Sequence, residues 1–319
     1  MTFATRKLGA NGPTVSALGL GCMGMSEFYG HADRQNSLDT IAAALDAGIT
    51  LFDTGDFYGM GHNELLLAEA LRGRRDRAFI QVKFGSLRAP DGAFLGIDAR
   101  PATMKNALSY SLRRLNSDHI DLYMTGFDPA VPVEETVGAM GEMVRQGYIR
   151  YVGLMNVDAE TLRRAHAAWP ITALQYEYGL LSRDMEQEIL PLCRELGIGI
   201  TAYGVLSRGL LTGSSGNGEG DVRSTYYPRF QGENLTQNRQ LAAALARVAD
   251  SEGITVAQAA IGWVLSQGEE IIPLVGARTV ARLTEALNAP LQLSAAALVV
   301  IEQVVPRDAV QGERFMVRK

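Results

Sequence analysis

The composition is that of an ordinary globular protein and already excludes several classes of function. The chain has 319 residues, of which 47% are hydrophobic and 20% are charged, and its formal net charge is −5. Thirty basic residues against 35 acidic ones leave no basic surplus for nucleic acid, and the two cysteines, Cys22 and Cys193, exclude a disulfide framework and a Cys-x-x-Cys zinc site. No apolar run reaches about 18 residues, and the N-terminus lacks the apolar core of a secretory signal. We therefore expect a cytoplasmic protein that binds neither nucleic acid nor membranes.

In chain order, a predicted hairpin comes first and eight strand-like runs follow. The segment RKLGANGPTVSALGLG places Asn-Gly and Gly-Pro between two short alternating runs, which predicts an N-terminal β-hairpin. Short apolar runs rich in β-branched residues then recur and predict strands. The first strand is expected near 17–21, and the others at 49–54, 78–84, 119–124, 151–155, 171–176, 198–203 and 271–276.

Stretches with helical periodicity separate these runs. They are SLDTIAAALDAG, NELLLAEALRG, ATMKNALSYSLRRL, VEETVGAMGEMVRQG, AETLRRAHAAW, MEQEILPLCRELG and TVARLTEALNA. Asn63, Asp158 and Thr279 are expected to cap helix N-termini. The segment 207–235 breaks the rhythm, because it is rich in Gly, Ser and Asn; we expect it to be a lid or a disordered insertion after the seventh strand.

Strands that alternate with helices imply parallel pairing through right-handed crossovers. Eight such units in about 300 residues predict a (β/α)8 TIM barrel, an α/β fold, here with an N-terminal β-hairpin and a long loop after strand 7. An open doubly wound sheet is the alternative fold. No linker or shift in composition divides the chain, so residues 1–319 are expected to form one domain.

Polar residues at the predicted strand ends are the candidates for chemistry, because barrel sites form at the carboxyl ends of the strands. Lys83 is the one lysine of four at such an end, and Asp53 on the neighbouring strand is its natural partner. A purely structural ion pair is one interpretation. The other adds Tyr58, because a nearby ammonium would lower the pKa of its phenol and the three residues would form a proton donor without a metal.

These residues lie in segments that resemble the aldo-keto reductases, which are NAD(P)H-dependent carbonyl reductases on a (β/α)8 barrel. The matching segments keep the family's order over nearly the whole chain and include ALDAGITLFDTGDFYGMGHNE, IQVKFG, GYIRYVGL, LQYEY, LGIGITAYGVLSRGLLTG and GARTVARLTEAL. The resemblance implies that Asp53, Tyr58 and Lys83 are catalytic. It also implies reduction of an aldehyde or ketone by NADPH, with the proton supplied by Tyr58.

The sequence departs from the family's pattern at two places. The family's histidine at the end of strand four is replaced by Gly126, in a stretch that is one residue shorter, and none of the chain's four histidines aligns with it. The Ser-Asn pair after strand five becomes Met155-Asn156, and the methionine cannot donate a hydrogen bond. The first departure leaves acid chemistry with Tyr58 but changes how the substrate carbonyl is oriented.

The resemblance also implies a cofactor site. Tyr203 resembles the aromatic residue that stacks on the nicotinamide, and Asn156 and Gln175 resemble the amides that hold its carboxamide. Arg278 and Arg282, four residues apart at a helix start, would clamp an adenosine 2′-phosphate and favour NADPH over NADH. The other implied cofactor-binding residues are Gly21, Cys22, Met23, Asp53, Gly204, Val205, Leu206, Ser207, Arg208, Gly209, Gly276 and Glu285.

One motif points to a different fold. Residues 19–24 fit the pattern Gly-x-Gly-x-x-Gly, which in a Rossmann fold opens a helix and precedes an acidic residue about 20 positions on. Here MSEFYG follows, and Asp39 lies within a helical pattern. We therefore reject the Rossmann interpretation.

Two functions remain open. The first is the NADPH-dependent reduction of a small-molecule carbonyl, and an aromatic or medium-sized apolar substrate is favoured over a sugar. The alternative is an NADPH-binding regulatory protein of the same fold with little turnover, which the missing histidine favours and the intact trio opposes. The preference for an apolar substrate follows from the expected pocket walls, which are Met25, Phe28, Tyr29, Phe57, Gly126, Phe127 and the 207–235 loop.

Overall fold

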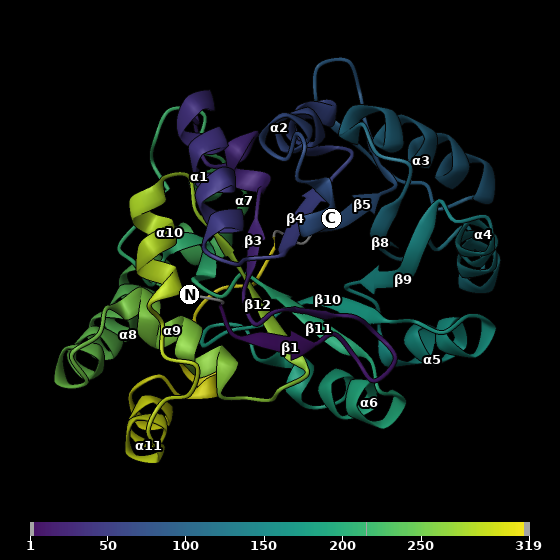
Figure 1. Cartoon of the computed structure of the whole chain (residues 1–319). Helices are drawn as coiled ribbons and strands as arrows, with labels where there is room; N and C mark the ends of the chain where they lie inside the picture. Colours follow the sequence, from purple (N-terminus) through teal and green to yellow (C-terminus); the bar gives the residue numbers. More distant parts are fainter. Residues whose placement is uncertain (1–2, 215, 316–319) are drawn as a thin grey trace.

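The centre of the molecule is a closed barrel of eight parallel strands. The computed structural model describes residues 3–214 and 216–315. The strand order is β10-β11-β12-β3-β4-β5-β8-β9, and β9 pairs with β10 to close the barrel (Figure 1). The predicted (β/α)8 barrel is confirmed, and the open sheet is excluded. The strands are β3 (Gly19–Gly21), β4 (Leu51–Gly55), β5 (Phe79–Phe84), β8 (Ile120–Thr125), β9 (Ile149–Met155), β10 (Ala173–Glu177), β11 (Gly199–Tyr203) and β12 (Ile271–Gly276).

Helices surround the barrel, as Figure 1 shows. Asp158 and Thr279 cap their helices as predicted, because their side chains accept from the Thr161 and Arg282 amides. The prediction for Asn63 is wrong: Gly61 occupies the cap position. The helices are α1 (Arg34–Asp46), α2 (His62–Ala70), α3 (Pro101–Leu115), α4 (Val133–Arg145), α5 (Ala159–Ala168), α6 (Ile189–Leu196), α7 (Arg223–Tyr226), α8 (Gly232–Ser251), α9 (Val256–Leu265), α10 (Val280–Leu287) and α11 (Ala295–Val304).

Asn63 lies inside the protein instead of at a cap. Its side-chain oxygen accepts from the Thr54 hydroxyl at 2.6 Å, and its amide donates to the Cys22 carbonyl and to the Ser26 hydroxyl at 2.9 and 2.7 Å. It therefore joins the ends of β3 and β4 to the first turn of α2. A buried polar side chain can join elements in this way only when its donors and acceptors have hydrogen-bond partners.

Two hydrophobic clusters hold the fold. The larger one fills the layer between the strands and the helices. The smaller one lies inside the barrel and includes Leu51, Leu122 and Leu274. The predicted N-terminal hairpin, β1 (Thr5–Lys7) with β2 (Thr14–Ser16), adds Leu8 and Val15 to this inner cluster and so closes the amino ends of the strands. That end is packed with side chains, which leaves the carboxyl ends for chemistry.

Side chains along each strand point alternately to the inside and the outside of the barrel. This alternation separates the two clusters and places a layer of polar side chains inside the barrel. On β4, Leu51 belongs to the inner cluster and Phe52 to the outer one. The same period of two continues toward the carboxyl ends, so that Asp53, Lys83 and Gln175 lie inside the barrel above the apolar layer.

The segment 207–235 is ordered in the described residues and ends earlier than predicted, because α8 begins at Gly232. It folds back onto residues 28–30: the Val222 amide donates to the Phe28 carbonyl at 3.1 Å, and Tyr29 forms a β-bridge with Asp221. The segment therefore acts as a cover over the loop that follows β3.

A second hairpin was not expected from the sequence. Strands β6 (Ser86–Arg88) and β7 (Phe94–Ile97) pair antiparallel between β5 and α3. The Asp98 amide donates to the Gly85 carbonyl at 2.8 Å and closes the base of this hairpin. The hairpin therefore stands at the carboxyl end of β5, beside Lys83.

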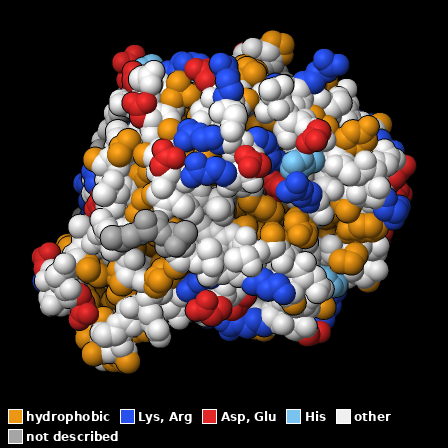
Figure 2. Space-filling model, in the orientation of Figure 1, with side chains coloured by type: hydrophobic (Ala, Val, Ile, Leu, Met, Phe, Trp, Pro, Cys, Tyr) orange, Lys and Arg blue, Asp and Glu red, His pale blue; other side chains and the backbone are white. Residues whose placement is uncertain are grey.

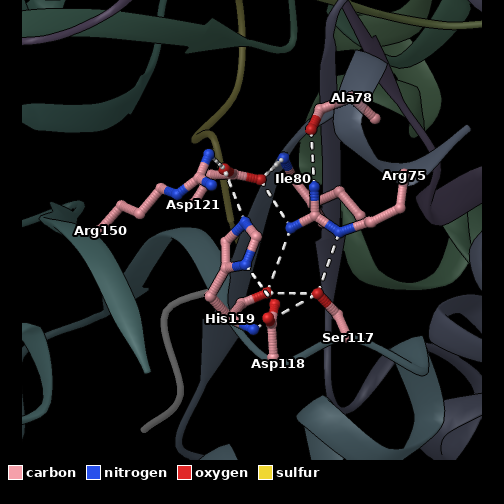
Figure 3. Close-up of polar contacts among 8 residues, drawn as sticks. All are labelled: Arg75, Ala78, Ile80, Ser117, Asp118, His119, Asp121 and Arg150. Atoms are coloured by element: carbon pink, nitrogen blue, oxygen red, sulfur yellow. Dashed lines mark hydrogen bonds and ion pairs between the residues drawn. The ribbon is translucent and has the colours of Figure 1, made fainter. Parts of the chain in front are cut away.

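At the amino ends of the strands, Asp121 ties three elements together (Figure 3). Its carboxylate has 1% exposure and accepts from the Ile80 amide at 2.9 Å, from Arg75 at 2.7 Å and from Arg150 at 2.9 Å. Arg75 also donates to three other oxygens, two of them backbone carbonyls. A shallow hollow of about 390 Å³ lies against this cluster, on the far side of the barrel from Asp53.

Acidic and basic side chains alternate over the face seen in Figure 2, with apolar side chains scattered between them. This mixture agrees with the small net charge of −5. Among the helices of the described residues, none is both long enough and apolar enough to cross a bilayer.

Candidate active site

The Asp53 carboxylate is the centre of the polar layer. One of its oxygens accepts from Lys83 Nζ at 2.5 Å, from Gln81 at 2.7 Å and from Gln175 at 2.8 Å. Asp53 and Lys83 are 5% and 2% exposed. The predicted ion pair between neighbouring strands is confirmed. Burial lowers the pKa of Lys83, and the Asp53 carboxylate opposes that shift by stabilising the ammonium.

Tyr58 lies directly after β4, in the short 3-10 turn Tyr58–Gly61. Lys83 Nζ is 4.8 Å from the centroid of its ring, and Phe57 packs edge-on against that ring at 4.8 Å. Burial raises the pKa of the Tyr58 phenol well above its usual value, and the Asp53 charge adds to the rise. The expected net lowering by Lys83 is therefore not observed in this state. The phenol is held protonated, the form that can donate a proton.

The amide and aromatic candidates gather on the opposite wall of the barrel mouth. Asn156 follows β9 with a left-handed backbone (φ 50°), and its side-chain oxygen accepts from the Tyr203 hydroxyl at 3.2 Å. Gln175 points into the barrel and donates to Asp53. Asn156 and Tyr203 are therefore in direct contact, and Gln175, on the strand β10 between theirs, reaches across the barrel to Asp53.

Two paired glycines end β3 and β12 and leave this end of the strand pair free of side chains. Gly21 and Gly276 are paired in register, and a Cβ added to either would meet only backbone atoms, at 3.8 Å. Met23 beside them is partly exposed, so it can contact a ligand that lies over these strand ends. Cys22 cannot offer its side chain as predicted, because the residue is fully buried and its thiol donates to the Leu20 carbonyl at 3.6 Å. Its backbone is engaged as well, because the Cys22 amide donates to the Asp53 carbonyl and the Cys22 carbonyl accepts from the Asn63 side chain.

The segment 204–209 has an unusual backbone. Gly204 and Gly209 have positive φ, and so do the non-glycine residues Ser207 and Arg208, at 50° and 56°. Such angles are costly for L side chains and tend to occur at ligand-binding loops. The Ser207 hydroxyl is buried without a hydrogen-bond partner. Val205 is in the core and Leu206 packs against it, so these two can bind a ligand only through their backbones.

Arg208 does not point into open space. Its guanidinium pairs with the buried Glu177 carboxylate at 2.9 Å and stacks on the Tyr227 ring at 4.5 Å. The expectation that its side chain assists an anionic ligand would require this pair to open. The simpler role for Arg208 is to hold the covering segment, which contains Tyr227, against the end of β10.

The arginines at the start of α10 are exposed but engaged. Arg278 donates to the Tyr29 and His31 carbonyls at 3.0 and 3.2 Å. Arg282 pairs with Glu285 at 2.9 Å, so these two predicted site residues contact each other. Both guanidiniums lie at a helix N-terminus, where free amides also favour an anion.

The expected substrate walls are only partly where the sequence placed them. Phe28, Tyr29 and Phe57 are half-buried at the mouth, and Phe127 is 42% exposed at its rim. Met25 is 3% exposed and belongs to the core, so it does not line the mouth. Gly126 is buried, and the place of its missing Cβ lies 3.6 Å from Ile97 Cδ1 and from Met155 Cε. The space beside Gly126 is therefore apolar.

Sequence reasoning missed three polar residues of the mouth. Gln81 precedes Lys83 by two positions on β5, so strand alternation could have found it. Glu27 and Arg88 contact each other at 3.3 Å, from the loop after β3 and from the unexpected hairpin. A Pro-Asp-Gly turn at 90–92 was the available signal for that hairpin.

Over the residues that the structure describes, no group of three or more His, Cys, Asp or Glu is arranged to hold a metal ion.

Comparison with known proteins identifies the family. The model of the aldo/keto reductase family matches residues 17–305. The chain belongs to the aldo-keto reductase family. A curated relative, probable aldo-keto reductase 1 from Glycine max, is 40% identical over 317 residues, which cover 97% of this chain and 91% of that protein.

Solved structures of aldo-keto reductases have the same architecture. The glycerol dehydrogenase AKR11B4 from Gluconobacter oxydans superposes with a TM-score of 0.84 at 28% identity, over 98% of this chain and 99% of that one. An aldo-keto reductase from Klebsiella pneumoniae, solved in complex with NADP and acetate, gives 0.76 at 26% identity, over 98% and 99%. This aldo-keto reductase is therefore an oxidoreductase of a family that acts on small carbonyl compounds.

Proposed function

We propose that this aldo-keto reductase uses NADPH to reduce an aldehyde or ketone to an alcohol, with Tyr58 as the proton donor. The observation that carries the proposal is the buried trio: the Asp53 carboxylate holds the Lys83 ammonium at 2.5 Å, and that ammonium faces the Tyr58 ring at 4.8 Å. When bound, the cofactor supplies the hydride, and the protein supplies position and the proton.

The residues present fit a dinucleotide. The strand ends at Gly21 and Gly276 carry no side chains, which leaves their backbone open to a flat group. Tyr203 would stack on the nicotinamide, while Asn156 and Gln175 would hold its carboxamide. The strained backbone around Ser207 and its unpartnered hydroxyl suit a pyrophosphate. Arg278 and Arg282 would take a 2′-phosphate, and this favours NADPH over NADH.

The proton chemistry depends on the charges around Tyr58. The phenol donates its proton to the substrate oxygen as negative charge develops there. The Lys83 ammonium stabilises the phenolate that remains, and Asp53 keeps that ammonium charged and oriented. In the unliganded site burial keeps Tyr58 protonated. The proton is therefore transferred when the substrate oxygen becomes more basic than the phenolate.

The experiment is steady-state oxidation of NADPH, followed at 340 nm with a panel of small aldehydes. Turnover of NADPH at about 1 s⁻¹ or faster, within the usual range for enzymes, supports the reductase. Tight NADPH binding without turnover on any aldehyde would instead support a regulatory protein of the same fold, which the glycine at position 126 favours.

A further inference from the structure

One arginine at the mouth has no part in the chemistry proposed above. Arg88, on β6, lies over the rings of Phe28 and Phe57, with Cζ 5.6 and 5.8 Å from their centroids. Phe57 packs in turn against the Tyr58 ring. The Arg88 guanidinium is thus separated from the proposed proton donor by a single aromatic ring.

The hydrogen bonds of Arg88 are incomplete. Nη1 donates to the Gly92 carbonyl at 3.2 Å, and Nη2 donates to the Glu27 carboxylate at 3.3 Å. Nε is buried and has no acceptor in the described structure. Buried donors of a charged group are normally satisfied, so this edge of the guanidinium lacks a partner. A carboxylate complements this edge chemically, because its two oxygens can accept from Nε and Nη2 together.

Glu27 is the residue that a ligand would have to displace or share. Its contact with Arg88 is single and long, and the two side chains retain 22% and 16% exposure. Burial also raises the pKa of Glu27, so its charged form is less favoured than that of a free glutamate. The pair is therefore weaker than the bidentate contact that a ligand carboxylate would make.

The element that carries Arg88 is fixed beside the pocket. Its base is closed by the bond from Asp98 to Gly85, and Ile97 on β7 packs against the position of the missing Cβ of Gly126. The hairpin thus presents an apolar side chain close to the strand ends and a guanidinium farther out. A substrate lying between them would have an apolar middle and a negative end.

We propose that Arg88 is a specificity-determining residue that binds a carboxylate of the substrate. On this proposal, which rests on the proposed function and names its substrate class, the enzyme prefers oxo-acids with an aromatic or short apolar spacer. The carbonyl end lies at Tyr58, the spacer contacts Phe28 and Phe57, and the carboxylate accepts from Nε and Nη2 of Arg88.

The test compares 4-carboxybenzaldehyde with 4-nitrobenzaldehyde, which has nearly the same shape but no net charge. The quantity measured is the ratio of kcat/KM for the carboxylate substrate to kcat/KM for the nitro substrate. In Arg88→Gln we expect this ratio to fall at least about 10-fold below its wild-type value, mainly because KM for the carboxylate rises. Glu27→Gln removes the competing carboxylate and should raise the ratio. Arg163→Gln, which removes an exposed arginine from α5, is the matched control and should leave the ratio unchanged.

A merely structural ion pair would not make this ratio fall in Arg88→Gln and rise in Glu27→Gln. If Arg88→Gln leaves the ratio unchanged, or if both variants lower it alike, Arg88 only holds the hairpin and the proposal is overturned. If the wild type oxidises NADPH with neither aldehyde, the proposed function fails separately. In that case the binding of benzoate, measured by calorimetry, decides the proposal. The affinity for benzoate must fall at least about 10-fold in Arg88→Gln. Equal affinities of the variant and the wild type would refute the proposal.

Discussion

The Lys83 ammonium is enclosed by protein, and the Asp53 carboxylate is the group that keeps it charged. Burial of a lone ammonium would strongly favour its neutral form. Gln81 and Gln175 donate to the same Asp53 oxygen and so fix the carboxylate in its position beside Lys83. A bound carbonyl would thus face a lysine and a tyrosine that are both fixed in position before the substrate arrives.

Position 126 offers a residue-scale prediction about substrate shape. A Cβ fits there at ordinary contact distance, but an imidazole would have to displace Ile97 or Met155, or else project into the mouth. We expect Gly126→His to lower kcat/KM for a bulky aldehyde at least about 10-fold, while a small aldehyde is spared. Gly126→Ala serves as the control and should affect both substrates little. Unchanged kinetics in Gly126→His would mean that this position does not face the substrate.

Asp56 gives a prediction about pH. Burial raises the pKa of Asp56 to about 7, and Glu64 adds to the shift. The unfolded chain releases this proton near pH 4, whereas the folded protein keeps it until about pH 7. The contribution of Asp56 to stability therefore falls as the pH rises through this window, because the folded state binds this proton more tightly than the unfolded chain.

Asp56→Asn removes that titration. The Tm of the variant, relative to wild type, should rise by at least about 2 °C between pH 4.5 and pH 7.5, as followed by circular dichroism. Asp250→Asn, at an exposed position on α8, should show no such trend. A constant difference between Asp56→Asn and wild type would show that Asp56 titrates as a free carboxylate.

At the scale of elements, the strands were predictable because each carries its own signal. Short β-branched runs gave all eight barrel strands to within a few residues, and strand adjacency then placed Asp53 beside Lys83. Helix α8 was missed because its first turns, GENLTQN, have a loop-like composition. Helices α9 and α11 were missed because their apolar runs, VAQAAIGWVL and AAALVV, have no clear period.

The missed parts of the site depend on three-dimensional placement. Arg88 is one of many arginines until the hairpin of residues 86–97 folds over Phe28 and Phe57. The direction of the Tyr58 pKa shift likewise depends on how deeply the phenol is buried, which its neighbours in the sequence do not reveal. In both cases the residue type was visible but its surroundings were not.

The Asp121 cluster gives a prediction about how elements are joined. Asp121→Ala would leave Arg75, Arg150 and the Ile80 amide without their shared acceptor at the amino ends of the strands. We expect a loss of about 3 kcal/mol or more and a fall in Tm of at least about 5 °C in thermal unfolding. Asp118 lies nearby in the preceding loop and is almost fully exposed. Asp118→Ala should therefore change Tm by less than about 2 °C. Equal Tm values for the two variants would contradict this account.

At the scale of the whole molecule, the proposed cofactor site combines segments that are far apart in the sequence. Strand β3 near the N-terminus lies between β12 and β4, so Gly21 meets Gly276 and Arg278 reaches the carbonyls of Tyr29 and His31. The covering segment after β11 then packs on the same loop. Closure of the barrel thus brings three separated segments together at one side of its mouth.

This arrangement predicts the choice of cofactor. NADPH should bind at least several-fold more tightly than NADH, and Arg278→Ala should reduce that ratio toward one, because a guanidinium facing the 2′-phosphate is lost. Both dissociation constants can be measured by fluorescence quenching at one salt concentration, with Arg163→Gln as the control. Equal wild-type affinities, or a ratio that Arg278→Ala does not change, would remove the assignment.

The central claim is that Tyr58 gives the proton, and a single-turnover experiment on Tyr58→Phe tests it most directly. The preformed complex with NADPH is mixed with an excess of aldehyde, and the loss of absorbance at 340 nm is followed in a stopped-flow instrument. The phenylalanine keeps the packing against Phe57 but has no proton to give. We predict that the rate falls by about 10²-fold or more while the dissociation constant for NADPH stays near that of the wild type. Reduction by Tyr58→Phe at the wild-type rate would show that the proton comes from another group.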